Sequence, residues 1–479
     1  MLFFMLKHSD YNFLIDNNHL PSLWKDMPWK KINIAVKKMQ RNIYKASIDG
    51  DAQMIKLNQK ILLEHKLSSV LAAHKSLKSH YYQTKTTVDK NREFIGTIIH
   101  GSYSNQRLCY LLRYEKLDIQ IAAIRMLILL ALQPEWEARV ESNSYGFLSG
   151  FTPKQAIVKA YSILSQNIDY ENSFVIVGEI NDWFDGIDTK LILSKTIYKD
   201  ETKQNLFNLF RHASLCNPRG VIPDKFQSFN MLSFSYNSPS LMLANIFVYG
   251  LEKALLWKFY NLNHHFHNSK SPIVNIIIYS NHFLIIFSSK NLKNTTIAIN
   301  TLDDFLSSMK QTLNISSLNM RFINEGIDFL GCHFKRYPNT NSWNYETSKI
   351  LIQPTKDNIK KHLLSLRQCL YHKDRFNRWR ANSHMTESAV INKLNPLIKR
   401  FSDYYQDLVP LIILTKIDKT LNEMIYRYAI KKYKANKYQK WQQSWIQVIQ
   451  GKKMIGYQDH INSQYRLLLL HDPSKYFKC

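Results

Sequence analysis

Hydrophobic and polar positions indicate β-strands in the central part of this chain and α-helices toward its two ends. Two apolar, β-branched runs within residues 273–287 flank the polar interruption Tyr279-Ser280-Asn281-His282. Short runs rich in Ile and joined by a tight polar link are typical of a buried β-hairpin. Residues 174–188 predict another buried strand that leads into a turn and a helix.

Helical periodicity governs the two ends of the chain. Near the N-terminus, the apolar positions at helical spacing are Ile32, Val36, Met39 and Ile43. The pair Asp49-Gly50 interrupts this pattern, and a second helix is predicted from about residue 51 to residue 67. Near the C-terminus, one predicted apolar face comprises Leu394, Leu397, Phe401, Tyr405 and Leu408, and another comprises Ile417, Leu421, Met424, Ile425 and Tyr428.

Charge divides the chain in a way that the hydrophobic pattern does not show. The 479 residues suffice for two or three domains and have a net charge of +27. Residues 22–90 hold 14 Lys and Arg against 5 Asp and Glu, and residues 355–479 hold 24 against 9, whereas the remaining 285 residues are near neutral. A near-neutral centre between two basic ends indicates a folded core flanked by modules that bind a polyanion. A generally basic surface without such a partner is the alternative.

Cysteine, histidine and apolar patterns restrict the other classes. The five cysteines contain no C-x-x-C pair, so neither a disulfide framework nor a zinc ribbon is expected, and a reducing compartment is the simplest interpretation. The histidines at 264, 265 and 267 match no common metal-ligand spacing, and no metal site is predicted. The longest apolar run, residues 126–132, is too short to span a bilayer, and no secretory signal is evident.

Basic and aromatic side chains at both ends are the candidate contacts with a polyanion, either a nucleic acid or an anionic membrane surface. Off the apolar face of the first helix lie Lys30, Lys31, Lys37, Lys38 and Arg41. The later candidates are Arg375, Arg378, Arg380, Lys399, Arg400, Tyr404, Tyr405, Arg427, Lys431, Lys432, Lys434, Lys437 and Trp441. Cations interleaved with aromatic rings suit phosphate contact combined with stacking on unpaired bases. Solvated helix faces with core aromatics are the alternative.

Several stretches resemble group II intron-encoded proteins, which are maturases built on a reverse transcriptase scaffold. The similarity begins at residues 29–50 and tightens at Ala131-Leu-Gln-Pro-Glu-Trp-Glu-Ala-Arg139, followed by Asn143-Ser-Tyr-Gly-Phe147. Leu394-Asn-Pro396, Phe401-x-x-Tyr404-Tyr405, Asp418, Leu421 and Tyr426-Arg-Tyr428 resemble domain X, the maturase domain of that family.

The resemblance implies an α+β fold with reverse-transcriptase-like fingers and palm, a helical thumb and a helical domain X. The implied boundaries are a basic helical extension at 22–90, fingers and palm at 91–337, thumb at 338–385, domain X at 386–450 and a C-terminal tail at 451–479.

The polymerase positions that the resemblance identifies differ from the family pattern. Tyr279-Ser280-Asn281-His282 stands where the family has Tyr-Ala-Asp-Asp, and Glu179 stands at the position of another metal-binding Asp. Polymerases hold two metal ions about 4 Å apart with clustered carboxylates. One Glu beside Asn and His would not hold two divalent ions, so we expect no DNA synthesis and no catalytic residues in this protein.

The expected function is therefore assistance in splicing a group II intron, or a related shortened (group III) intron, from organellar pre-mRNA. The intron RNA would supply the chemistry and bind the Mg²⁺, so no protein cofactor is expected; other splicing factors are conceivable partners. Scarce Gly and Pro with abundant Lys, Asn and Ile indicate an AT-rich genome, and we expect a plastid, with a mitochondrion as the alternative. An active reverse transcriptase and a general RNA-binding protein without intron specificity remain open.

Overall fold

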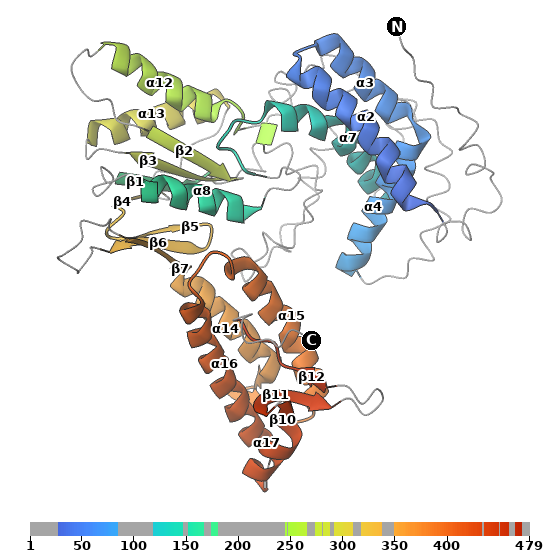
Figure 1. Cartoon of the computed structure of the whole chain (residues 1–479), viewed down its shortest axis with the longest axis vertical. Coiled ribbons are helices and arrows are strands. Elements are labelled where there is room, and N and C mark those ends of the chain that lie inside the picture. The colour runs from blue at the N-terminus through green and yellow to red at the C-terminus, as the bar shows by residue number, and fades with distance from the viewer. Residues whose placement is uncertain are drawn as a thin grey trace.

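The protein contains three bodies, which Figure 1 shows as N-terminal helices, a central layered sheet and a C-terminal group of helices. The computed structural model describes residues 27–84, 118–146, 152–166, 174–180, 245–246, 248–265, 274–279, 281–287, 292–309, 318–337, 349–433, 435–449, 451–458 and 465–471. The mixture of helical bundles and antiparallel sheets agrees with the predicted α+β class.

The described helices of the N-terminal bundle are α2 (Trp29–Ile48), α3 (Ala52–Glu64), α4 (Lys66–Thr84) and α7 (Asp118–Arg139). The predicted apolar face of α2 is confirmed, because Ile32, Val36 and Ile43 are fully buried. Gly50 adopts a φ of +72° between α2 and α3, a conformation that glycine tolerates without a steric penalty. Asp51 then caps α3, since its Oδ1 accepts the backbone N–H groups of residues 53 and 54 at 3.0 Å.

The central sheet has the strand order β2-β3-β1-β4 and is antiparallel. Its strands are β1 (Phe174–Glu179), β2 (Val274–Tyr279), β3 (His282–Phe287) and β4 (Asn319–Phe322). The predicted hairpin at 273–287 is confirmed as β2 and β3, joined at the register pair Tyr279 and His282. The strand predicted at the start of residues 174–188 is observed as β1, which pairs with β3 on the side opposite β2. The predicted turn and helix that follow lie outside the described residues.

Both faces of this sheet are covered, which explains why its strands are apolar at nearly every position. Helix α8 (Pro153–Gln166) packs on one face, where Ile277, Leu284 and Ile286 are buried. Helices α12 (Leu251–His265) and α13 (Leu292–Ser308) cover the other face (Figure 1). Successive strand residues point to opposite faces, so a sheet covered twice needs continuous apolar runs rather than alternation.

A second sheet, of order β5-β6-β7, lies between the central sheet and the C-terminal helices (Figure 1). Its strands are β5 (Ile327–Phe329), β6 (Cys332–Tyr337) and β7 (Lys349–Pro354). Ile350 and Ile352 of β7 belong to the same hydrophobic cluster as the α8 face of the first sheet. Strand β7, which lies in the segment predicted as thumb (338–385), therefore shares a core with the central sheet.

The C-terminal body is helical with two small sheets. Its elements are α14 (Lys356–Leu370), β8 (Tyr371–Lys373), β9 (Trp379–Ala381), α15 (Glu387–Tyr405), α16 (Leu411–Lys432), α17 (Lys437–Trp445), β10 (Ile446–Ile449), β11 (Lys452–Gln458) and β12 (Tyr465–Leu467). Leu366 and Leu370 of α14 share one hydrophobic cluster with Val390 and Leu421. The predicted boundary at residue 385 therefore does not separate two cores.

The prediction of a separate C-terminal tail at 451–479 is wrong for the part that the structure describes. Strand β11 pairs with β10 and β12, and Leu468 is buried in the same cluster as α14 and α15. His471 is fully buried, and its Nδ1 lies 2.7 Å from Oδ1 of Asp418 on α16. This segment completes the C-terminal core, which is consequently not purely helical. Among the described helices, none is long and apolar enough to span a membrane.

Candidate nucleic-acid interface

The end of the β2–β3 hairpin brings together the three polar residues that the family resemblance placed at polymerase positions. Glu179 lies opposite His282 in the β1–β3 register. The Asn281 side chain donates a hydrogen bond from Nδ2 to Glu179 Oε1 at 2.7 Å, and His282 Nδ1 lies 4.0 Å from Glu179 Oε2. The backbone N–H of Ile180 donates to the carbonyl of Asn281 at 2.8 Å, which extends the contact between β1 and the hairpin by one residue.

This group of three side chains contains one carboxylate. Burial lowers the pKa of His282 despite the opposing effect of the Glu179 carboxylate, so the imidazole is neutral at pH 7. Asn281 occupies one oxygen of Glu179 with its amide. The acidic residues 182, 185 and 188 lie outside the described residues. In the described geometry, one carboxylate at the end of a packed hairpin is hydrogen-bonded to an amide. A site for two metal ions would instead need several clustered carboxylates.

The loop after α7 contacts this hairpin, and it ends the described part of the family-like block that begins at residue 131. Backbone hydrogen bonds join the loop to the edge of β2, from Tyr145 N–H to the Ile278 carbonyl at 2.8 Å and from Ile278 N–H to the Asn143 carbonyl at 2.9 Å. The buried Glu252 of α12 accepts hydrogen bonds from Ser142 and Asn143 at 2.8–3.1 Å. The block therefore connects the N-terminal helices with the central sheet.

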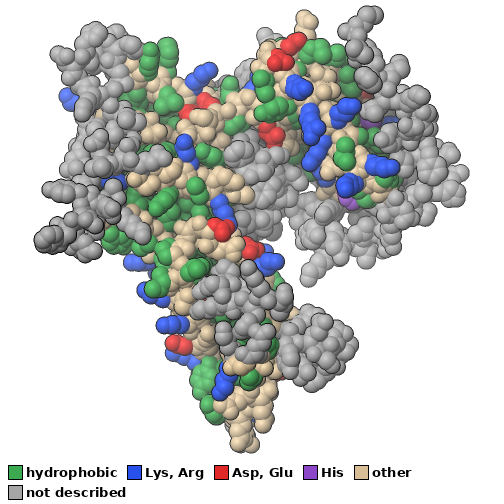
Figure 2. Space-filling view, in the orientation of Figure 1, with side chains coloured by type: hydrophobic (Ala, Val, Ile, Leu, Met, Phe, Trp, Pro, Cys, Tyr) green, Lys and Arg blue, Asp and Glu red, His purple; other side chains and the backbone are tan. Residues whose placement is uncertain are grey.

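The basic face of α2 is exposed as predicted. Its cations Lys30, Lys31, Lys37, Lys38 and Arg41 all lie at the surface, and the helix contains no acidic residue. Figure 2 shows Lys and Arg side chains gathered over this part of the N-terminal body. The α2 helix can therefore present several cations to one phosphate backbone.

A second basic surface surrounds Tyr371 at the start of β8. The Lys431 Nζ lies 5.7 Å from the centre of its ring. Burial raises the pKa of Tyr371, and the nearby guanidinium groups of Arg367 and Arg427 oppose that shift. Cations from α14 and α16 thus converge beside the β8–β9 hairpin. The predicted contacts Arg427 and Lys431 belong to this surface, whereas sequence patterns gave no signal for the position of Tyr371.

The β8–β9 hairpin carries three more of the predicted cations. Arg380 pairs with His372 in the strand register, so its side chain lies on the face of the hairpin opposite to that of Tyr371. Arg378 and Arg380 each donate their Nε–H to Asp374 Oδ2, at 3.2 and 3.0 Å, and their side chains remain 60% and 54% exposed. Arg375 is exposed beside them. One acidic residue therefore positions the arginines of this hairpin without covering them.

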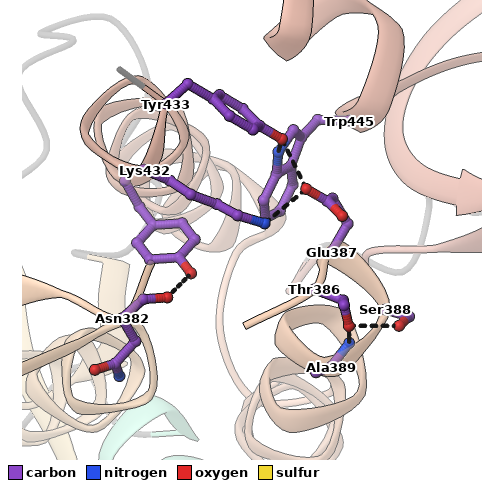
Figure 3. Close-up of polar contacts among 9 residues, drawn as sticks. Asn382, Thr386, Glu387, Ser388, Ala389, Lys432, Tyr433 and Trp445 are labelled. Atoms are coloured by element: carbon purple, nitrogen blue, oxygen red, sulfur yellow. Dashed lines mark hydrogen bonds and ion pairs between the residues drawn. The ribbon is translucent and has the colours of Figure 1, made fainter. Parts of the chain in front are cut away.

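Lys432 has a different environment from its neighbour Lys431. Its Nζ donates to Glu387 Oε1 at 2.7 Å, and only 11% of its side chain is exposed. Figure 3 shows that Tyr433 donates to the same carboxylate, at 2.7 Å, and accepts a hydrogen bond from Trp445 Nε1 at 3.0 Å. Lys432 therefore joins α16 to α15, and its prediction as an RNA contact is corrected.

Comparison with known proteins identifies both ends of the chain. The N-terminal domain of reverse transcriptase matches residues 24–92, and the maturase-specific domain of group II introns matches residues 371–445. The chain is also 22% identical over 406 residues to Maturase-like protein 1 of Euglena longa, covering 81% of this chain and 79% of that protein. At both ends, and over most of its length, the chain is therefore similar to group II intron maturases.

The maturase-specific match refines the predicted start of domain X at residue 386. It begins at Tyr371, so the β8–β9 hairpin belongs to the maturase domain rather than to a preceding thumb. This agrees with the shared core, in which Tyr371 packs edge-to-face against Tyr428 at a centroid distance of 5.8 Å. The basic surface around Tyr371 therefore lies within the maturase domain.

Two predicted aromatic contacts of the maturase domain are structural instead. Tyr405 is 1% exposed, and its hydroxyl donates to the carbonyl of Gly331 at 2.9 Å. The hydroxyl of Tyr404 donates to the carbonyl of Leu330 at 2.7 Å. Both rings consequently fasten the end of α15 to the turn between β5 and β6. The prediction that Tyr405 stacks on RNA is wrong because its ring is buried.

The remaining predicted residues of the maturase domain divide by exposure. Lys399, Arg400 and Lys437 are exposed, as an RNA contact requires. Trp441 is partly buried and stacks on Trp445 at a centroid distance of 5.9 Å, so one face of its indole is occupied. Lys434 lies outside the described residues.

Proposed function

We propose that this protein is an RNA-binding maturase that assists the splicing of group II introns, or of the related shortened group III introns, without synthesising DNA. The intron RNA carries out transesterification and binds the Mg²⁺ that this chemistry requires. The protein holds the RNA in its active fold and uses no cofactor of its own.

The observation that carries this proposal is the arrangement of exposed cations around a near-neutral palm. One group lies on α2 within the reverse transcriptase N-terminal domain, and the other surrounds Tyr371 within the maturase-specific domain. Phosphate contacts release condensed counterions, so binding that depends on these cations weakens steeply as salt rises. A protein with two such surfaces can contact two parts of one folded RNA.

Crosslinking in cells tests intron specificity. Ultraviolet crosslinking of the full-length protein, followed by sequencing of the bound RNA, is expected to recover intron sequences. A recovered intron transcript should then compete for the protein better than a ribosomal RNA fragment of equal length at the same salt concentration. Equal competition by the two transcripts would establish a general RNA-binding protein instead.

A splicing assay tests the assistance itself. The recovered transcript should splice faster with the protein than without it at a Mg²⁺ concentration too low for the RNA to fold alone. An unchanged rate across the Mg²⁺ titration would contradict the maturase function.

Primer extension tests the absence of polymerase activity. The arrangement at the end of the hairpin supports a lack of DNA synthesis, because Glu179 is the one carboxylate among its three described polar residues. Extension of an annealed primer with Mg²⁺ or Mn²⁺ should therefore give no product. Robust synthesis would establish an active intron-encoded reverse transcriptase.

The proposed location is an organelle, with a plastid favoured over a mitochondrion because of the AT-rich codon bias that the composition implies. Immunolocalisation against organelle markers tests this, and a signal confined to the cytosol or nucleus would refute it.

A further inference from the structure

The tip of the β8–β9 hairpin exposes an aromatic ring that the predicted contacts do not include. Phe376 is 76% exposed, the largest value for any large hydrophobic side chain in the part of the chain that the structure describes. The ring lies at the turn of a short antiparallel ladder in which Lys373 pairs with Trp379. An exposed Phe is unfavourable in water unless another molecule covers it.

Asp374 fixes the loop that presents this ring. Its Oδ1 accepts the backbone N–H groups of Phe376 and Arg378, both at 2.9 Å. Its own backbone N–H donates to the carbonyl of Arg378 at 2.9 Å, and Asn377 adopts a φ of +60° within the turn. The loop is therefore ordered by local hydrogen bonds, and ordering the ring costs little additional entropy on binding.

The surroundings of Phe376 select the chemistry of its partner. The guanidinium of Arg378 lies 4.8 Å from the ring centre and covers one face, while the exposure of the side chain leaves the opposite face to solvent. At the base of the hairpin, the guanidinium of Arg367 lies 4.6 Å and the ammonium of Lys373 lies 5.5 Å from the ring centre of Trp379. The carboxylate of Asp374 is already engaged by the arginines. A planar ring surrounded by cations suits a nucleobase with flanking phosphates.

Only a nucleobase that is not stacked within a duplex has a free face for the ring of Phe376. Bases inside an A-form duplex are stacked on their neighbours and offer no free face, whereas bases in loops, bulges and single strands do. We propose that Phe376 stacks on an unpaired base of the bound RNA, with Arg375, Arg378 and Arg380 on the neighbouring phosphates. This inference rests on the proposed RNA-binding function and adds a structural feature of the RNA that is recognised.

Two defined probes test the proposal with the full-length protein. The probes are an oligo(A) of about 12 nucleotides, near the site size of single-strand modules, and a blunt RNA duplex of the same length. Phe376→Ala should weaken oligo(A) binding between about 5-fold and 150-fold, the range for one stacked base. Duplex binding should stay unchanged, because the cations remain. Phe376→Trp should retain affinity, and its added fluorescence should be quenched by oligo(A).

The control variant is Trp257→Ala, which removes a 65% exposed aromatic ring of α12 outside the basic surface. It should bind both probes as the unaltered protein does. Unchanged oligo(A) affinity for Phe376→Ala would overturn the proposal. An equal loss for oligo(A) and duplex would also overturn it, because the ring would then act only on the shape of the hairpin. These outcomes are distinct from a failure of intron specificity, which the competition assay measures with the unaltered protein.

Discussion

Two adjacent lysines at the end of α16 allow the effect of a lost charge on stability to be measured separately from its effect on RNA binding. Lys432 is 11% exposed and donates to Glu387, whose side chain is 24% exposed. Lys431 is exposed at the surface around Tyr371. Replacing each with Met removes the ammonium group but retains most of the aliphatic stem, so the two variants differ mainly in what the lost charge contacted.

The free energy of unfolding should fall by about 2–4 kcal/mol in Lys432→Met. A hydrogen bond to a charged group contributes roughly 1.5–3 kcal/mol, and the ammonium also lies 5.5 Å from the ring centre of Tyr433, a contact worth about 0.5–1 kcal/mol. Breaking a fully buried ion pair costs about 3–5 kcal/mol, and this value is an upper limit here. The Glu387 carboxylate is partly exposed, so water can hydrate it once the ammonium group is removed. Lys431→Met should lose less than about 1 kcal/mol, since it removes an exposed cation–π contact.

Urea unfolding and RNA titration at several salt concentrations measure the two effects. Lys431→Met should reduce the slope of log K against log salt by about 1, as expected for one lost phosphate contact. Lys432→Met should leave that slope unchanged under conditions in which the variant is folded. Similar stability losses for the two variants, or a reduced salt slope in Lys432→Met, would refute the structural assignment of Lys432.

Three further perturbations follow from other parts of the molecule. Burial, with a contribution from His471, lowers the pKa of His362 to about 2, whereas the unfolded value is 6.5. Below pH 6.5 the unfolded state therefore binds a proton that the folded state does not. The free energy of unfolding should consequently fall by about 1.4 kcal/mol per pH unit. Urea unfolding from pH 6.5 down to about pH 5 should show a shallower decline in His362→Gln, and parallel curves would contradict this. Lys37→Ala combined with Arg41→Ala on α2 should lower the salt slope of RNA binding by about 2, and an unchanged slope would place the N-terminal RNA contact elsewhere. Gly331→Ala should lower the thermal unfolding temperature more than Gly451→Ala does. Both glycines have a φ near +77°, but only at Gly331 would the added Cβ lie 2.4 Å from an amide nitrogen. Equal losses would show that the backbone conformation alone matters.

The sequence predicted elements whose apolar pattern is continuous over a whole element. The Ile-rich strands of the hairpin and the apolar face of α2 are examples, because burial on two sheet faces or on one helix face leaves a regular period. The short strands at 452–458 and 465–467 left no such pattern. Their core contribution depends on single residues such as Leu468 and His471, which contact helices far away along the chain.

The candidate RNA surface was predictable as a region but not residue by residue. A run of cations predicts a basic surface, yet Lys431 and Lys432 point in different directions on α16, and the partner of Lys432 lies 45 residues away. The sequence allowed two interpretations of Tyr405, as a core residue on an apolar helical face or as an aromatic RNA contact. Its burial shows that it is a core residue. Phe376 gave no sequence signal, because its exposure depends on the hydrogen bonds that Asp374 makes within the loop.

The hydroxyl groups of Tyr404 and Tyr405 have a consequence for the geometry of the RNA. They fasten the maturase domain to the Leu330–Gly331 turn, and the amide of Asn358 donates to the hydroxyl of Tyr405 at 3.0 Å. The loop after α7 is bonded to β2 of the central sheet. These contacts connect the N-terminal helices and the C-terminal body to neighbouring sheets. Under the proposed function, the distance between the two basic surfaces would limit the spacing between RNA segments that one protein molecule can bind together.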